Sequence, residues 1–220
     1  MDLTKNEEDY LKALFMLSVE AGTELVGTNH IASGLGLAPA SANSMLKKLT
    51  DKTLVHYEKH GKWVLTDEGK RIALQLIRKH RLWETFLYEK LEFTWDEVHE
   101  VAEQLEHIHS KKLVEKLDKF LGHPEFDPHG DPIPNEKGKY KAVRKLTLSE
   151  VPPGAVCKLI AVKDTSAAFL QYVSEIGLGI RSQIKLVDRR DFDNSISIEV
   201  DGRQVQVSEK FAINVFVVVV

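Results

Sequence analysis

The spacing of apolar and polar positions predicts a helical N-terminal region that ends in a β-hairpin. Residues 4–20 carry apolar side chains every three or four positions, which indicates an amphipathic helix. Shorter helices are expected over residues 28–35 and 39–52, the second with Pro39 in its first turn. Residues 54–66 alternate apolar and polar side chains around a glycine, which is typical of a hairpin. Helix, turn, helix and hairpin in this order predict a winged helix-turn-helix.

The middle of the chain continues with longer helical patterns. Three helices are expected, over residues 67–91, 94–109 and 110–121. Asp67 and Ser110 are candidate N-caps for the first and third, and either Thr94 or Asp96 is expected to open the second. Residues 122–142 contain four prolines and three glycines, which predicts a loop or linker.

Beyond residue 143 the pattern changes to short β-rich segments. Strands are expected over residues 156–162, 183–189, 195–200, 203–207 and 214–220, with a helix over 166–178. The fold class predicted is therefore mainly α with a small, barrel-like β domain. We expect a DNA-binding domain over residues 1–73, a helical domain with its linker over 74–142, and a β domain over 143–220.

The composition narrows the class of protein without identifying it. The chain has 220 residues, of which 43% are hydrophobic and 29% charged, and it contains no apolar run of about 18 residues that would predict a membrane span. The N-terminus lacks the basic segment of a signal peptide, and the single cysteine, Cys157, excludes an internal disulfide. A cytoplasmic protein is expected.

The distribution of charge is more informative than the net charge of −3. Residues 36–62 contain five lysines and two acids, whereas residues 92–106 contain six acids and no lysine or arginine. Six of the nine histidines lie between residues 80 and 129. Such segregation predicts different partners for different segments.

The basic segment coincides with the predicted helix-turn-helix and favours DNA as a partner. A recognition helix contacts base edges with its N-terminal residues, here Pro39, Ala40, Ser41 and Asn43. Phosphate contacts are expected from three lysines, Lys47, Lys48 and Lys62. With so few charged contacts per subunit, we expect a dimer on a palindromic site. The alternative is a helix-turn-helix retained only as a scaffold or dimerisation unit.

The acidic, histidine-rich segment predicts a metal site. On a helix His99, Glu103, Glu106 and His107 fall on one face, because residues three and four apart are neighbours. Oxygen and imidazole ligands suit manganese, ferrous iron or zinc. The alternative is a solvated acidic face with an incidental histidine.

An enzymatic function was weighed against these binding functions and is not favoured. The sequence "HEVAE" at residues 99–103 resembles the zinc-protease motif, but Glu103 replaces the second histidine. Nucleophile-elbow and phosphate-loop motifs are absent from the sequence, and Cys157 lies in an apolar β segment, as a core residue does. We therefore expect no catalysis and no small-molecule substrate.

Four segments together resemble one known family. They are "EEDYLKALFML" (7–17), "RKHRLWETFL" (78–87), "VHEVAEQLEHIHS" (98–110) and "DPHGDPIP" (127–134). In order and spacing they are similar to segments of the diphtheria-toxin-repressor family of metal-dependent repressors. The resemblance covers the whole chain and implies a winged helix-turn-helix, a helical dimerisation domain with metal sites, and an SH3-like (FeoA-like) domain.

The resemblance also implies metal ligands. A primary site would take Asp9, Glu103, Glu106 and His107. The iron-responsive branch of the family carries sulfur-bearing residues at two of these positions, so the set is similar to that of the manganese-responsive branch. Lys12 stands where the short manganese regulators have a glutamate, so no pair of ions sharing that carboxylate is expected.

A second metal site is implied in the same way. Its ligands would be Glu84, Asp127, His129 and Asp164, and His80 and His99 would be weaker, ancillary ligands. Related manganese regulators carry a cysteine at the position of Asp127, which leaves the metal preference of this site open.

The function expected from the resemblance is a repressor that binds palindromic operator DNA as a homodimer when loaded with Mn²⁺, and that controls metal-uptake genes. Fe²⁺ and other divalent transition metals are alternatives to Mn²⁺ as the cofactor, because Mn²⁺ and Fe²⁺ both accept these ligands. The alternative is a winged-helix regulator whose effector is a small organic ligand or a protein.

Overall fold

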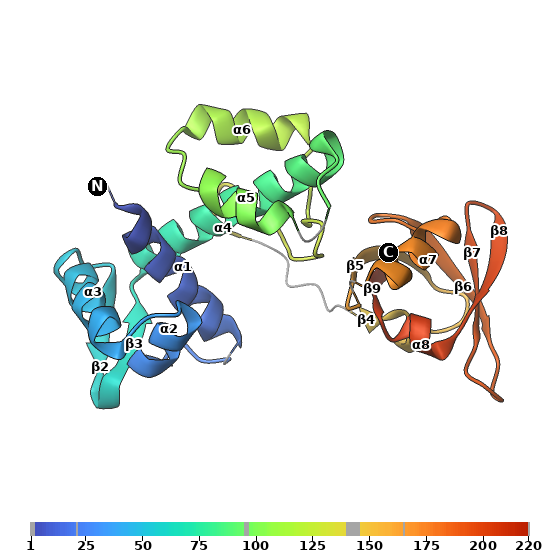
Figure 1. Cartoon of the computed structure of the whole chain (residues 1–220), viewed down its shortest axis with the longest axis horizontal. Coiled ribbons are helices and arrows are strands. Elements are labelled where there is room, and N and C mark those ends of the chain that lie inside the picture. The colour runs from blue at the N-terminus through green and yellow to red at the C-terminus, as the bar shows by residue number, and fades with distance from the viewer. Residues whose placement is uncertain (1–2, 21, 95–96, 140–145, 165, 220) are drawn as a thin grey trace. The chain divides into compact units, whose positions relative to one another are not determined.

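The computed structural model describes residues 3–20, 22–94, 97–139, 146–164 and 166–219 (Figure 1). Its contacts divide the chain into two units, Met1–His123 with Ile133–Tyr140, and Pro124–Pro132 with Lys141–Val220. The boundary expected at residue 73 falls inside one continuous helix, α4 (Asp67–Leu91), so the two predicted helical domains belong to one unit.

The first unit begins with the predicted winged helix-turn-helix. Its elements are α1 (Lys5–Glu20), β1 (Val26–Gly27), α2 (Thr28–Gly34), α3 (Pro39–Asp51), β2 (Val55–Glu58), the 3-10 turn η1 (Lys59–Gly61) and β3 (Lys62–Leu65). The strands form an antiparallel sheet in the order β1-β3-β2. Leu11, Ile31, Leu46 and Leu49 are fully buried in the core that these elements share. The predicted periodicities are thus confirmed in this region.

The rest of the first unit consists of α4, α5 (Val98–Leu105) and α6 (Lys111–Phe120). Ser110 caps α6 as predicted, because its side chain accepts the N–H of Leu113. The cap of α4 was predicted wrongly: Thr66, not Asp67, accepts the N–H of Gly69. The helix predicted to end at His109 already ends at Leu105. Asp96, one of its two predicted starts, lies outside the described residues.

The second unit is built on a six-stranded antiparallel sheet in the order β4-β9-β5-β6-β7-β8. The elements are β4 (Leu146–Thr147), η2 (Leu148–Glu150), β5 (Val156–Val162), α7 (Ala167–Glu175), β6 (Gln183–Arg189), β7 (Ile196–Val200), β8 (Arg203–Val207), α8 (Glu209–Ala212) and β9 (Val215–Val219). Cys157 is fully buried in its apolar core, as predicted, and burial raises the pKa of its thiol to about 11. None of the described helices is long and apolar enough to cross a membrane.

The loop 124–132 packs against β5 in this unit. Gly130 has a φ of +75°, and a Cβ at this position would lie 2.7 Å from the carbonyl oxygen of Ile160. Only glycine fits so close a backbone approach in the left-handed conformation. The loop therefore lies beside the strand whose end leads to Asp164.

Candidate metal centre and DNA-binding face

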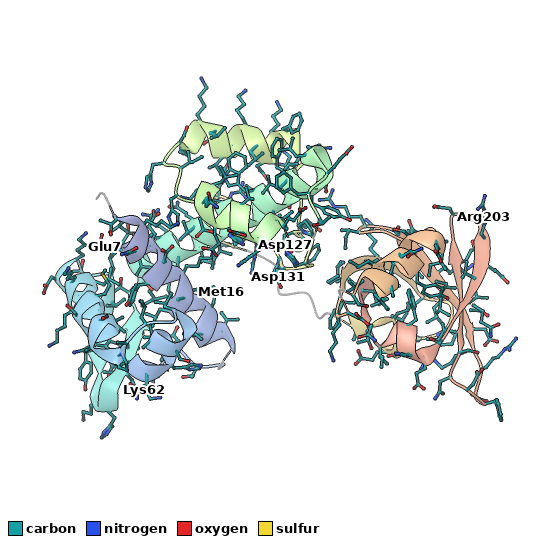
Figure 2. The ribbon with its side chains drawn as sticks, in the orientation of Figure 1. Glu7, Met16, Lys62, Asp127, Asp131 and Arg203 are labelled. Atoms are coloured by element: carbon teal, nitrogen blue, oxygen red, sulfur yellow. The ribbon has the colours of Figure 1, made fainter. Side chains whose placement is uncertain are left out.

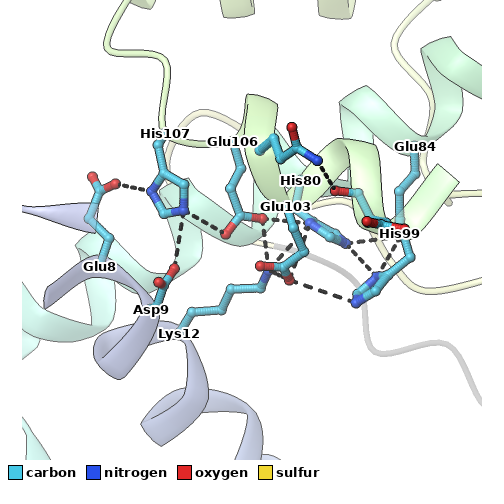
Figure 3. A network of polar contacts seen from close by, with 11 residues as sticks. Glu8, Asp9, Lys12, His80, Glu84, His99, Glu103, Glu106 and His107 are labelled. Carbon is cyan, nitrogen blue, oxygen red and sulfur yellow. Dashed lines mark hydrogen bonds and ion pairs between the residues drawn. The ribbon is translucent and has the colours of Figure 1, made fainter. Parts of the chain in front are cut away.

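Three helices of the first unit direct charged side chains toward one another. They come from α1 (Glu8, Asp9, Lys12), from α4 (His80, Glu84), and from α5 and the turn after it (His99, Glu103, Glu106, His107) (Figure 3). Within each helix the spacing of three or four residues places these side chains on one face. Both groups of metal-ligand atoms found among the described residues lie here.

The first group, which we call the primary cluster, consists of Asp9, Glu106 and His107. The Nε2 atom of His107 lies 3.1 Å from Oδ1 of Asp9 and 3.7 Å from Oε1 of Glu106. All three atoms are buried, and none has a hydrogen-bond partner among the described residues. Buried polar atoms without partners are costly, so this arrangement calls for a cation at their centre.

Glu8 fixes the proton of His107. Its Oε2 lies 2.6 Å from Nδ1 of His107, and its side chain is almost completely buried. A carboxylate only accepts hydrogen bonds, so Nδ1 carries the proton and the lone pair of Nε2 points toward Asp9 and Glu106. A carboxylate behind a ligating histidine is the usual support of a metal site.

The pKa of Asp9 is raised by the same buried surroundings. Burial raises its pKa, a positively charged His107 would oppose this shift, and the negative charge of Glu106 adds to it. A divalent ion at the cluster would remove the repulsion between the two carboxylates.

The second group consists of His80, His99 and Glu103. Together with Glu84, which contacts both histidines, we call it the histidine cluster. Nε2 of His80 lies 2.9 Å from Oε1 of Glu84 and 3.2 Å from Nδ1 of His99. Nδ1 of His80 lies 2.5 Å from Oε2 of Glu106. Burial lowers the pKa of His80, but the hydrogen bonds to Glu106 and Glu84 outweigh it and raise the pKa to about 9.

Lys12 lies between the two clusters. Its ammonium is 2.6 Å from Oε1 of Glu103, 2.7 Å from Oε2 of Glu106 and 3.3 Å from Nδ1 of His80 (Figure 3). Burial raises the pKa of Glu103, but the hydrogen bond from Lys12 and the charges of Lys12, His80 and His99 together lower it by more, so the net shift is downward.

The structure therefore divides the four side chains that the sequence placed on one helical face. Glu106 and His107 join Asp9, whereas Glu103 groups with His80 and His99. Two features of the structure explain this division. Since α5 ends at Leu105, Glu106 and His107 follow in a turn, and the ammonium of Lys12 holds Glu103 on the other side.

The residues of the predicted second site are distributed over both units. Glu84 belongs to the histidine cluster of the first unit. Asp127 is buried in the loop of the second unit and accepts the backbone N–H groups of His129 and Asp131. The backbone N–H of Ser166 donates to Asp164 and lowers its pKa. The second site stays a prediction.

The expected DNA-binding residues are on an accessible face. Pro39, Ala40 and Ser41 are exposed at the start of α3, and Asn43 is partly exposed. Lys47, Lys48 and Lys62 are exposed, and Figure 2 shows Lys62 at the hairpin of β2 and β3. The opposite face of α3, with Ala42, Leu46 and Leu49, is buried in the core. The exposed face of α3 is thus polar, as expected for a helix that contacts a DNA groove.

Sequence reasoning missed Glu8. It contacts a residue 99 positions away, which no local pattern can indicate. The pair of His80 and Glu84 had a local signal, since the two stand four residues apart on a helix that the periodicity predicts.

Three family models match consecutive parts of the chain. Residues 2–62 match "Iron dependent repressor, N-terminal DNA binding domain". Residues 66–135 match "Iron dependent repressor, metal binding and dimerisation domain", and residues 146–219 match "FeoA domain". Together these models account for both units.

Individual proteins agree with this assignment. The chain is 30% identical over 162 residues to "Iron-dependent repressor IdeR" of Mycobacterium tuberculosis, which is 70% of this chain and 69% of that relative. A solved structure, "Manganese-dependent transcriptional repressor complex with manganese", is 35% identical, with a TM-score of 0.65 over 97% of this chain and all of that one. The chain spans only 31% of the length of another relative, "Probable metal transport system membrane protein" of Chlamydia trachomatis, to which it is 32% identical over 142 residues.

Proposed function

Because the chain belongs to the iron-dependent repressor family, a family of DNA-binding transcriptional repressors and not of enzymes, we propose that it is a divalent-metal-dependent repressor. Loaded with Mn²⁺, it binds palindromic operator DNA as a homodimer and lowers the expression of metal-uptake genes.

The observation that carries this proposal is the primary cluster. Asp9, Glu106 and His107 aim three buried acceptor atoms at one another with no donor among the described residues to satisfy them. A divalent ion bound there would supply the missing positive charge and join the three side chains. The residues thus fit a metal ion better than they fit a purely structural role.

The chemistry of the ligands favours Mn²⁺ or Fe²⁺ over softer ions. Two carboxylates and one imidazole form a hard set without sulfur, which suits Mn²⁺ and Fe²⁺ and not the softer ions. A relative's solved structure is titled as a complex with manganese, which supports Mn²⁺. Fe²⁺ remains the alternative cofactor.

The positions of the ligands connect metal binding to DNA binding. Asp9 lies on α1, which packs against α2 and α3, whereas Glu106 and His107 follow α5, which packs against α4. The three side chains therefore hold α1, and with it the recognition helix α3, in a fixed orientation to α4. A ligand that favours one orientation shifts the population toward it, with a coupling typically of about 1–3 kcal/mol.

Operator binding with and without metal tests the function. DNA that binds the Mn²⁺-loaded protein is first selected from a random library, and its affinity is then measured by fluorescence anisotropy in chelator and in Mn²⁺. We expect a loss of at least about fivefold in chelator, corresponding to the lower end of that coupling. The variant Ser41→Ala with Asn43→Ala should lose sequence-specific binding while it retains metal binding.

Equal DNA affinity in chelator and in metal would contradict the proposal and favour a regulator with an organic effector. One observation supports that alternative. A cavity of about 330 Å³ lies between α4 and the start of α6, lined by Leu76, Lys79, Ile108 and Lys111 among others. Its lining combines apolar side chains with both basic and acidic ones, which suits a small polar organic molecule.

A further inference from the structure

Lys12 carries a positive charge, the same sign as a metal ion, between the two clusters. Its side chain is 15% exposed and contacts Glu103 and Glu106, of which Glu106 is fully buried. The ion pair with Glu106 is strong because it is buried where the dielectric is low, whereas Glu103 is 36% exposed and its ion pair is weaker.

Glu106 is shared between this lysine and the primary cluster. Its Oε1 faces His107, and its Oε2 faces both Lys12 and His80 (Figure 3). The ammonium therefore withdraws negative charge from a carboxylate that a divalent ion at the primary cluster would use.

Lys12 affects Glu103 more directly than it affects Glu106. The sequence predicts Glu103 as a ligand of the primary site, yet Lys12 holds its Oε1 at 2.6 Å and it groups with His80 and His99. For Glu103 to reach the primary cluster, this ion pair has to break.

We propose that Lys12 is an affinity-setting residue, a built-in cation that competes with the divalent ion for Glu103 and Glu106 and thereby sets the metal concentration at which the chain responds. This inference rests on the proposed function. In the metal-free chain Lys12 keeps α1 attached to α4 and α5 in place of the ion. Metal binding exchanges the ion pair with Glu103 for a ligand bond.

The test measures Mn²⁺ affinity by calorimetry in full-length variants. Lys12→Met removes the charge and keeps the length of the side chain, so Mn²⁺ should bind about tenfold or more tightly. In chelator the same variant should unfold at a lower temperature, because Glu103 and Glu106 lose their counter-ion, and the rise in unfolding temperature on adding Mn²⁺ should exceed that of the wild type. Lys12→Arg keeps the charge and should behave like the wild type.

Lys52, directly after α3, provides a matched control. Lys52 forms an ion pair of 2.7 Å with Glu7, another buried glutamate of α1, outside both clusters. Lys52→Met should lower the stability of the metal-free and the metal-loaded chain alike and leave the Mn²⁺ affinity unchanged.

The outcomes separate this inference from the proposed function. If the wild type binds no divalent ion, the proposed function is wrong. If the wild type binds Mn²⁺ and Lys12→Met binds it equally or more weakly, the proposal for Lys12 is wrong and the function stands. Should the methionine variant not fold, Lys12→Gln carries the same expectation, because its neutral amide still donates to the two carboxylates.

Discussion

The primary cluster and the histidine cluster contain the same kinds of side chain in opposite states. In the primary cluster three buried acceptor atoms face one another without a donor. In the histidine cluster His80 lies within 2.9 Å of carboxylates on both sides of its ring, and Lys12 neutralises Glu103. The difference shows that ligand type alone does not make a metal site. What matters is whether protons and lysines of the chain already satisfy the ligands.

This comparison predicts a strong and a weak site. A divalent ion entering the primary cluster displaces no hydrogen bond of its three acceptor atoms. An ion entering the histidine cluster has to displace the proton of His80, whose pKa is about 9, and must bind beside the ammonium of Lys12. The primary cluster should therefore fill first.

The largest effect is expected from Glu106, which contributes an oxygen to each cluster. Glu106→Ala should weaken the tightest Mn²⁺ binding by more than about 100-fold, since loss of a mere supporting residue already costs about 10- to 100-fold. Calorimetric titration measures this. Glu100→Gln, an exposed glutamate on the same helix, is the control and should bind like the wild type. If Glu106→Ala binds Mn²⁺ as tightly as the wild type, the primary cluster is not the stronger of the two metal sites.

A smaller effect is expected from Glu8, which supports the primary cluster alone. Glu8→Ala should weaken the tight ion by about 10- to 100-fold, because His107 loses the acceptor that fixes its proton on Nδ1. Glu8→Gln should lose less, since its amide oxygen still accepts that N–H. Equal losses in both variants would indicate that the charge of Glu8, and not the orientation of His107, matters.

His99 tests the weaker cluster. Its ring is 63% exposed and lies 3.2 Å from Glu84, so His99→Ala should lower the affinity of a second, weaker ion by about tenfold. The tight ion should change by less than about threefold. Equilibrium dialysis over a wide range of Mn²⁺ concentration resolves the two. Loss of the tight ion in this variant would reverse the ranking of the clusters.

A further effect is a dependence of the metal-free stability on pH. The charged groups that face His80 come from three helices: Glu84 of α4, His99, Glu103 and Glu106 of α5 and its following turn, and Lys12 of α1. The folded pKa of about 9 exceeds the unfolded value, so the stabilisation is complete below pH 6.5 and is lost as the pH rises through 9.

In chelator the free energy of unfolding should fall by about 1 kcal/mol per pH unit between pH 7 and 9, relative to the variant His80→Gln. Urea denaturation at several pH values measures this difference. A parallel pH dependence in the two proteins would show that His80 is not the titrating group.

Much of the fold could be predicted because its signals are local. The periodicity over residues 4–20 and 67–91 and the alternation over 54–66 correspond to α1, α4 and the hairpin of β2 and β3. The end of α5 could not be predicted, since "LEHI" continues the apolar spacing without glycine or proline.

The candidate site was predictable only in part, for the same reason. Glu106 and His107 stand out by composition, but Asp9 came from the family resemblance and not from spacing. Glu8 and the ion pair of Lys12 with Glu103 join residues more than 90 positions apart. Which of the four predicted primary ligands faces which cluster depends on these contacts, and no pattern along the chain encodes them.

The continuity of α4 has a mechanical consequence. From Asp67, beside the hairpin, to His80, beside the clusters, the helix runs about 20 Å without a break, at about 1.5 Å per residue. It can act as a lever arm: a tilt of about 10° at the clusters displaces the far end by roughly 3.5 Å. That distance is close to the rise of one base pair, about 3.4 Å. A small rearrangement of the side chains in the clusters can therefore move the hairpin by about the rise of one DNA base pair.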